Sequence, residues 1–122
     1  MQAASELALR DPKAAVEAYD ALAADSRLND AMRDLAALRA GSLVVDTASY
    51  DDMRKRLEAA AATGRPFRNS ARELLALSAL RANDCATART WFSQIISDLS
   101  APQSLRQRVQ MLMALSGDAS NS

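Results

Sequence analysis

Apolar side chains recur every three or four positions along most of this chain, which is the spacing that places them on one face of an α-helix. Between positions 11 and 25 the residues with this spacing are Ala14, Ala15, Ala18, Tyr19 and Leu22. Asp11 precedes them as a suitable N-cap, and Pro12 stands in the first turn, where its missing N–H costs no hydrogen bond. The pattern predicts a helix that ends near Asp25.

Similar boundary signals divide the rest of the chain. Ser49 followed by Asp52 has the spacing of a capping box, which marks a helix start. Gly64 is suited to end a helix, and Pro102 is suited to open one. Residues 116–122 lack large apolar anchors, and we expect a disordered tail there. The signals predict about seven short helices, over approximately 1–10, 11–25, 29–44, 49–63, 67–82, 84–98 and 103–115.

Composition favours an all-α fold and removes most enzyme chemistry. Alanine, the strongest helix former, supplies 27 of the 122 residues, and aromatic residues make up 4%. The chain has no His and one Cys, which excludes His-dependent catalytic triads, imidazole or Cys-cluster zinc sites and disulfide frameworks. Cys85 has no base near it in the sequence, and Asp51 and Asp52 are explained as first-turn acids of a helix. We therefore predict a non-enzymatic protein with no metal and no cofactor.

An internal repetition gives the predicted helices an order. Asp84 stands 73 positions after Asp11, and the same offset relates Ala15 to Ala88 and Tyr19 to Phe92. An offset of this size fits two units of about 36 residues, each long enough for two helices. We predict an all-α, right-handed helical-hairpin solenoid over residues 1–115. Its expected parts are hairpins over about 1–28, 29–66 and 67–101 and a capping helix over 102–115.

The third unit resembles a tetratricopeptide repeat. With Asn69 as the first position of the repeat, the residues at matching family positions are Leu75, Ala76, Asn83, Asp84, Ala88, Phe92 and Ile95. The unit departs from the family at Arg72, where an aromatic residue is usual, and at Ala79, where a Tyr is usual. The resemblance implies a protein-binding module with a concave groove.

Three stretches, 67–84, 88–92 and 101–108, are similar to one group of tetratricopeptide-like proteins. These are alphaproteobacterial proteins related to the ancillary subunit of the Sec translocon. The resemblance implies a periplasmic repeat domain at the inner membrane of the cell envelope, held there by a transmembrane helix and engaging translocon or other envelope proteins. The chain itself shows no signal peptide and no apolar run long enough to span a bilayer, and Met1 falls inside the first helix of its hairpin. We therefore expect the soluble domain only, with the anchor in a segment outside this chain.

The repeat frame also predicts which residues face a groove. The groove positions that the resemblance implies are Asp34, Leu38, Glu73, Leu77, Arg81, Gln107 and Met111. Their mixture of leucine, methionine and acids favours an amphipathic helix or a basic peptide as the partner. The alternative is that some of these leucines simply pack beneath neighbouring helices.

Charge is divided unevenly between the two halves of the chain. Residues 1–52 carry 10 acids and 5 bases, and residues 53–122 carry 5 acids and 10 bases, so net charges of −5 and +5 cancel to zero. This asymmetry supports an alternative function, a structural domain that forms homo-oligomers through its oppositely charged halves. Six bases cluster locally, and without a basic excess over the whole chain we expect a solvated surface there and no nucleic-acid partner. They are Arg54, Lys55, Arg56, Arg65, Arg68 and Arg72.

Overall fold

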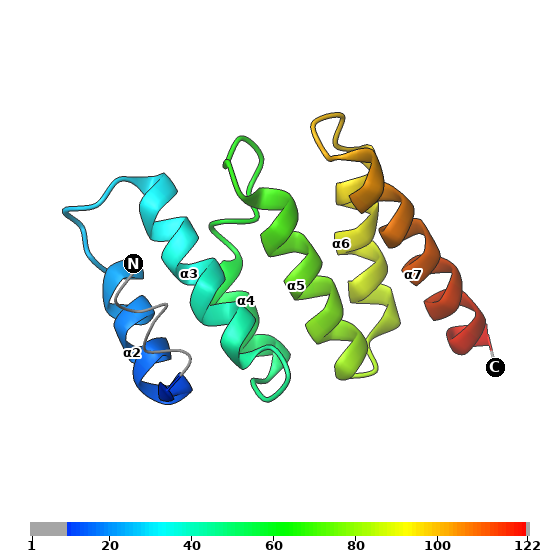
Figure 1. Ribbon diagram of the computed structural model, residues 1–122. Coiled ribbons are helices and arrows are strands. Elements are labelled where there is room, and N and C mark those ends of the chain that lie inside the picture. The colour runs from blue at the N-terminus through cyan, green and yellow to red at the C-terminus, as the bar shows by residue number, and fades with distance from the viewer. Residues whose placement is uncertain (1–9, 122) are drawn as a thin grey trace.

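The computed structural model describes the backbone of residues 10–121 and the side chains of residues 10–116. This part of the chain is all helical and contains no strand, so the all-α prediction is confirmed. The helix expected over 1–10 lies almost wholly outside the described residues. The helices, shown in Figure 1, are α2 (Pro12–Ala23), α3 (Asp30–Val44), α4 (Tyr50–Leu57), α5 (Arg68–Arg81), α6 (Cys85–Ser97) and α7 (Gln103–Asn121).

Side-chain caps fix the starts of four helices, because each carboxylate, amide or hydroxyl oxygen accepts a hydrogen bond from a backbone N–H of the first turn. Asp11 accepts from Ala14 at 3.2 Å, and Ser49 accepts from Asp52 at 3.1 Å. Asn29 and Asp84 cap α3 and α6 in the same way. The starts of these four helices were predicted to within one residue.

Two helix ends differ from the prediction. Helix α4 ends at Leu57, before the expected end near Thr63, and residues 58–67 form consecutive turns. The carbonyl of Ala61 in these turns accepts a hydrogen bond from the Arg72 guanidinium at 3.0 Å. No local sequence pattern predicts this contact. Helix α7 continues to Asn121, past the boundary expected at 115. Ser116, one residue beyond that boundary, is buried.

Asn83 and Asp84 form the turn between α5 and α6. Asn83 adopts a left-handed conformation with φ 61°, which asparagine tolerates better than most residues. The amide of Asp84 donates to the carbonyl of Ala79, and that of Asn83 donates to Leu80, each at 2.9 Å. These two bonds form a Schellman motif, which satisfies carbonyls at the end of α5 and reverses the chain into α6.

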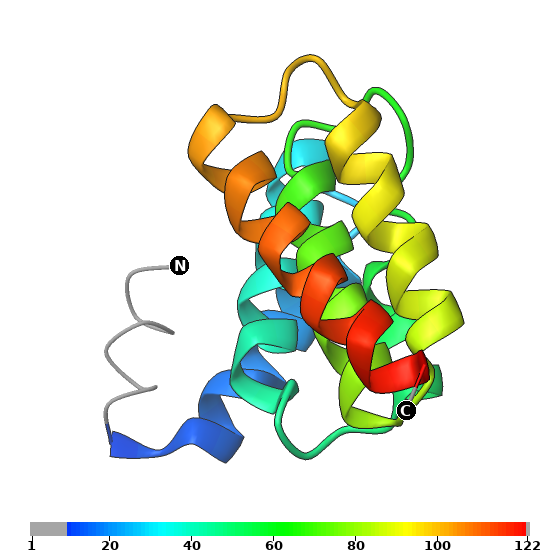
Figure 2. The same ribbon diagram turned by 90° about the vertical axis from the view of Figure 1, so that its right-hand side faces the viewer.

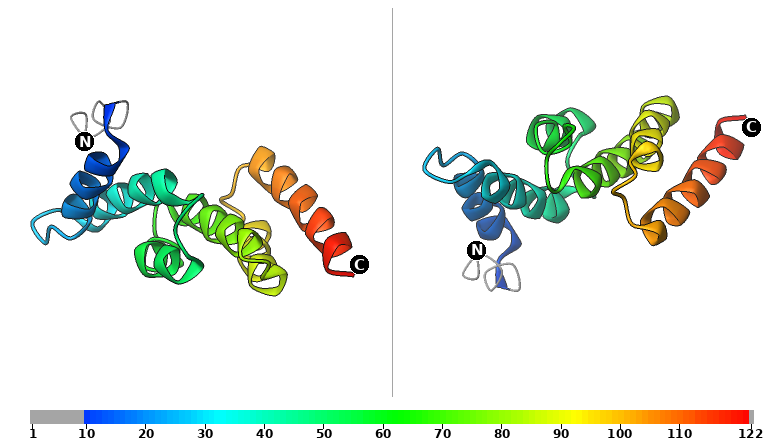
Figure 3. Two further views of the ribbon diagram at one scale, coloured as in Figure 1. Left: turned by 90° about the horizontal axis from the view of Figure 1, so that it is seen from below. Right: turned by 90° about the horizontal axis from the view of Figure 1, so that it is seen from above.

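The helices pack mainly against their neighbours in the chain: α2 against α3, α5 against α6, and α6 against α7 (Figure 1). Figures 2 and 3 show α4 and α6 on one side of the row formed by α3 and α5, and the start of α7 on the other side. Buried apolar residues form three clusters between successive helices. The aromatic residues of α6 belong to this core as predicted: Phe92 is fully buried, and half-buried Trp91 donates a hydrogen bond to the Tyr50 hydroxyl at 2.8 Å.

Candidate protein-binding surface

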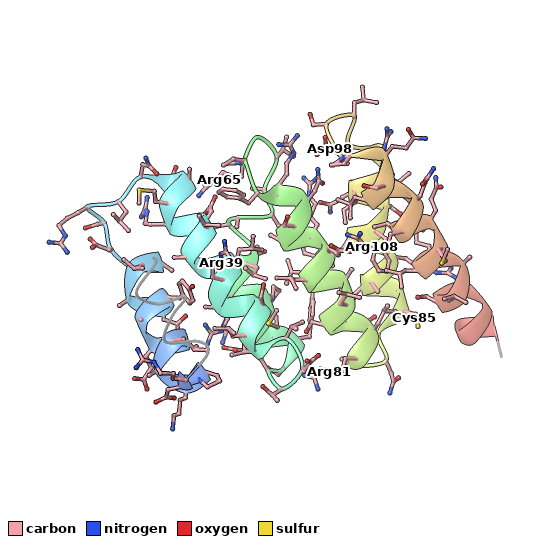
Figure 4. All side chains as sticks on the ribbon, viewed as in Figure 1. Arg39, Arg65, Arg81, Cys85, Asp98 and Arg108 are labelled. Atoms are coloured by element: carbon pink, nitrogen blue, oxygen red, sulfur yellow. The ribbon has the colours of Figure 1, made fainter. Side chains whose placement is uncertain are left out.

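The predicted groove residues lie on three helices that are neighbours in space. Asp34 and Leu38 are on α3, Gln107 and Met111 are on α7, and the other three are on α5 between them. Figure 4 shows all side chains in the orientation of Figure 1, with these three helices toward the viewer.

An ion pair fixes α5 against α7. The Glu73 carboxylate accepts two hydrogen bonds from the Arg108 guanidinium, from Nε at 2.8 Å and from Nη2 at 3.0 Å. This pairing raises the pKa of Arg108, because the carboxylate stabilises the charged form. Glu73 is therefore occupied by a neighbour within the chain. Arg108, which the sequence did not single out, follows Glu73 by 35 residues, about one repeat length.

Exposed apolar side chains follow this ion pair along both helices. Leu77 lies one turn beyond Glu73 on α5, and Met111 lies one turn beyond Arg108 on α7. Because the two helices run in the same direction (Figure 1), these side chains are at the same level of the molecule. Leu77 is 36% exposed and Met111 is 66% exposed. Leu115, one further turn along α7, is 61% exposed, and it was missed although it follows Met111 by four residues.

Arginine side chains accompany this apolar strip. Arg81 donates from Nη2 to the backbone carbonyl of Ala48 in the α3–α4 connection. Arg39 on α3 is exposed and makes no ion pair with any residue in the described part of the chain. Figure 4 places Arg39, Arg81 and Arg108 on α3, α5 and α7. We call Leu77, Met111 and Leu115, together with these three arginines, the α3/α5/α7 surface.

The two acids predicted for the groove are both neutralised. Asp34 is 4% exposed, and its carboxylate accepts from Nε and Nη2 of Arg65 at 2.8 Å each, which raises the pKa of Arg65. Asp34 thus holds the turns over 58–67 against α3. Leu38 is half-buried against the cluster that contains Leu57, as the packing alternative expected. The remaining unpaired charge on this face is positive, which does not favour the basic peptide considered from the sequence.

The six clustered bases serve ion pairing within the chain. Arg54 and Lys55 pair with Asp51, and Arg65 pairs with Asp34. Arg56 pairs with Asp20 and Asp52, and Arg68 and Arg72 share Asp98. Each of these bases has at least one carboxylate partner, so the cluster does not form an unpaired basic patch.

No grouping of metal-ligating side chains occurs within the residues that the structure describes. Cys85 is half-buried as a free thiol in the first turn of α6. Helices long and apolar enough to cross a membrane are absent from the described residues. Comparison with protein families, curated proteins and solved structures found no match to this chain.

Proposed function

We propose that this chain is a non-enzymatic protein-binding module with a tetratricopeptide-like arrangement of helices. The α3/α5/α7 surface is the proposed contact with a protein or peptide partner. The observation that carries the proposal is the exposure of Leu77, Met111 and Leu115 on α5 and α7, the two helices that the Glu73–Arg108 ion pair joins. Neighbouring exposed apolar side chains of this size are typical of interaction surfaces, since isolated ones are the norm elsewhere.

The packing beneath the two helices supports this proposal. Residues of α5, α6 and α7 share one buried apolar cluster, and the double hydrogen bond between Glu73 and Arg108 joins α5 to α7 at the surface. A preformed surface loses little conformational entropy on binding, so a short apolar strip gives more affinity than the same residues on a mobile loop.

The proposed partner segment is an amphipathic helix that presents apolar residues to the strip. Helix-in-groove recognition uses residues spaced by three and four positions, and Met111 and Leu115 have the same spacing on α7. By the resemblance described above, the module belongs to a membrane-anchored protein on the periplasmic face of the inner membrane, and its partners are translocon or other envelope proteins.

The ion pairs within the chain favour this proposal over charge-driven self-association. Arg56 and Arg65 of the basic half pair with Asp20 and Asp34 of the acidic half. Acids that would attract a second copy are thus partly neutralised inside one molecule.

Photo-crosslinking in the native cells tests the proposal. A photoreactive residue replaces Leu77 or Met111 in the full-length gene product, and Leu99 serves as the control, since it is 91% exposed and lies outside the α3/α5/α7 surface. We expect both surface positions, and not Leu99, to capture the same discrete protein. Capture of only a second copy of the chain, or capture of nothing, contradicts the proposal.

A further inference from the structure

A second hollow, distinct from the α3/α5/α7 surface, lies between the N-terminal half of α5 and the C-terminal half of α6. It has a volume of about 870 Å³, within the range of small-molecule sites. None of its lining residues belongs to the α3/α5/α7 surface. Leu99 is the one apolar residue among the lining residues in the described part of the chain.

Positive charge exceeds negative charge in this hollow. Three arginines, Arg68, Arg72 and Arg89, line it together with a single carboxylate, Asp98. Asp98 already accepts from Nε of Arg68 at 2.6 Å, from Nη2 of Arg68 at 3.1 Å and from Nη1 of Arg72 at 3.2 Å. One carboxylate thus faces three guanidinium groups, which leaves two positive charges without a counter-charge in the lining.

Arg89 provides the unpaired donors. It extends from α6 into the lining and has no carboxylate partner among the described residues. Its Nε is buried and makes no hydrogen bond in the structure. The Arg89 side chain is half-buried in the lining and has no carboxylate of its own there, and an anion held in the hollow would supply its counter-charge.

Neutral hydrogen-bonding groups surround the arginines. The hydroxyls of Thr63 and Ser93 and the amide of Gln94 line the same hollow, and so do Thr90 and Ser97, whose hydroxyls donate to the carbonyls of Ala86 and Ser93. Guanidinium groups bind phosphate oxygens with paired hydrogen bonds, and hydroxyl and amide groups suit the remaining oxygens of a polar ligand.

We propose that this hollow binds a phosphate group, either free or carried on a small polar molecule such as a sugar phosphate. Arg89 is the principal donor to the phosphate, with Arg72 beside it. The site is independent of the α3/α5/α7 surface, and its presence does not depend on the proposed protein-binding function.

Titration by NMR with inorganic phosphate and with ribose 5-phosphate tests this site in the full chain. We expect saturable shifts at the amides of Thr90 and Ser93, and at least about tenfold weaker binding in Arg89→Gln, because a charged hydrogen bond is lost. Arg106→Gln is the matched control. Arg106 also has a buried Nε without a partner, but it lies on α7 outside the lining.

A second variant protects the test if Arg89→Gln folds poorly. Ser93 is exposed, and Ser93→Glu adds a carboxylate to the lining, which we expect to abolish binding of both probes. Tighter binding of ribose 5-phosphate than of inorganic phosphate supports a sugar phosphate, and equal binding supports free phosphate. Failure of both probes to bind, or equal loss in Arg89→Gln and Arg106→Gln, overturns the proposal.

Discussion

At the scale of single residues, Asp98 has the most partners of any carboxylate in the described chain. Arg68 and Arg72 from α5 donate to it, and Asn69 adds a hydrogen bond at 3.1 Å. The Arg68 guanidinium, acting first of all through its hydrogen bonds, holds the pKa of Asp98 well below its usual range. Arg72 is 5% exposed, so loss of this carboxylate leaves a buried positive charge without compensation.

We expect Asp98→Asn to lower the free energy of unfolding by about 2 kcal/mol at neutral pH, the scale of hydrogen bonds to charged groups. Because the pKa of Asp98 is depressed in the folded state, its contribution is complete above the unfolded carboxyl's pKa of about 3.9 and is lost progressively as the pH falls from there toward the much lower folded-state pKa, so it is reduced in part near pH 3. Urea denaturation of both proteins at pH 7 and near pH 3 measures this difference.

Asp46→Asn is the control for this prediction, since Asp46 is exposed and makes no ion pair with a described residue. We expect it to match the parent protein at neutral pH. An Asp98→Asn protein as stable as the parent at pH 7, or a difference that persists unchanged near pH 3, contradicts the role assigned to Asp98.

What the sequence reveals at this scale depends on the distance between partners. The caps Asp11, Ser49 and Asp84 were predictable because each acts on an amide three residues away. Arg72 and Asp98 are separated by 26 residues, and nothing local indicates that they meet. The sequence therefore showed that Arg72 departs from the repeat pattern, but it did not show that Arg72 binds Asp98.

At the scale of elements, α4 is the shortest helix that the structure describes, with eight residues. Short helices depend strongly on their ends, since nucleation is costly and few internal hydrogen bonds follow it. Ser49 caps α4, while Asp51 and Asp52 place negative charge in its first turn, where the helix dipole favours it.

We expect Ser49→Ala to destabilise the protein by about 1 kcal/mol, the usual cost of removing an N-cap. Ser42→Ala is the matched control: Ser42 is an exposed serine within α3 that bonds to the Leu38 carbonyl and caps nothing. We expect this control to be neutral or slightly stabilising, because alanine is the better helix former. Thermal unfolding compares the two, and equal effects from both substitutions would show that the cap at Ser49 has no special role.

The starts of the elements were easier to predict than their ends. Capping oxygens and prolines mark starts locally, whereas the turns that follow α4 are held in part by a remote guanidinium, which binds the Ala61 carbonyl four residues after the end of the helix. Gly64 and Pro66 are helix-breaking residues, but they lie several residues beyond Leu57, where α4 ends. Helix α7 extends past the expected boundary at 115. Ser116 is buried there, and composition does not show which residues the packing of α7 buries.

At the scale of the whole molecule, part of the opposite charge of the two halves is paired within one chain. Arg56 reaches Asp20 at 2.5 Å across 36 residues, and Arg65 reaches Asp34 across 31 residues. The unequal division of charge was plain in the sequence, but which acids meet which bases follows only from the packing of the helices.

We expect the chain to be a monomer of 13.1 kDa in light scattering, both at low salt and at about 0.5 M salt. The reason is that several acids of the first half, Asp20, Asp34 and Asp51 among them, already pair with bases of the second half within the molecule. An oligomer that dissociates as salt screens its charges would instead support the self-associating structural domain.

The candidate surface was predicted in part. The repeat frame selected Leu77 and Met111, which the structure leaves open, and it also selected Asp34, which the structure buries against Arg65. A periodic pattern identifies the helix face that carries a residue. It does not show that a side chain distant in the sequence covers that residue, as Arg65 covers Asp34.

The most direct test of the α3/α5/α7 surface is the yield of partner captured by a photoreactive residue at position 77 when Met111 is changed to Asp. A charge on the neighbouring helix disrupts an apolar contact, and we expect the yield to fall several-fold. Leu99→Asp, which places the same charge on an exposed leucine outside this surface, is expected to leave the yield unchanged. A yield that Met111→Asp does not reduce, or that both changes reduce equally, would contradict recognition through α5 and α7.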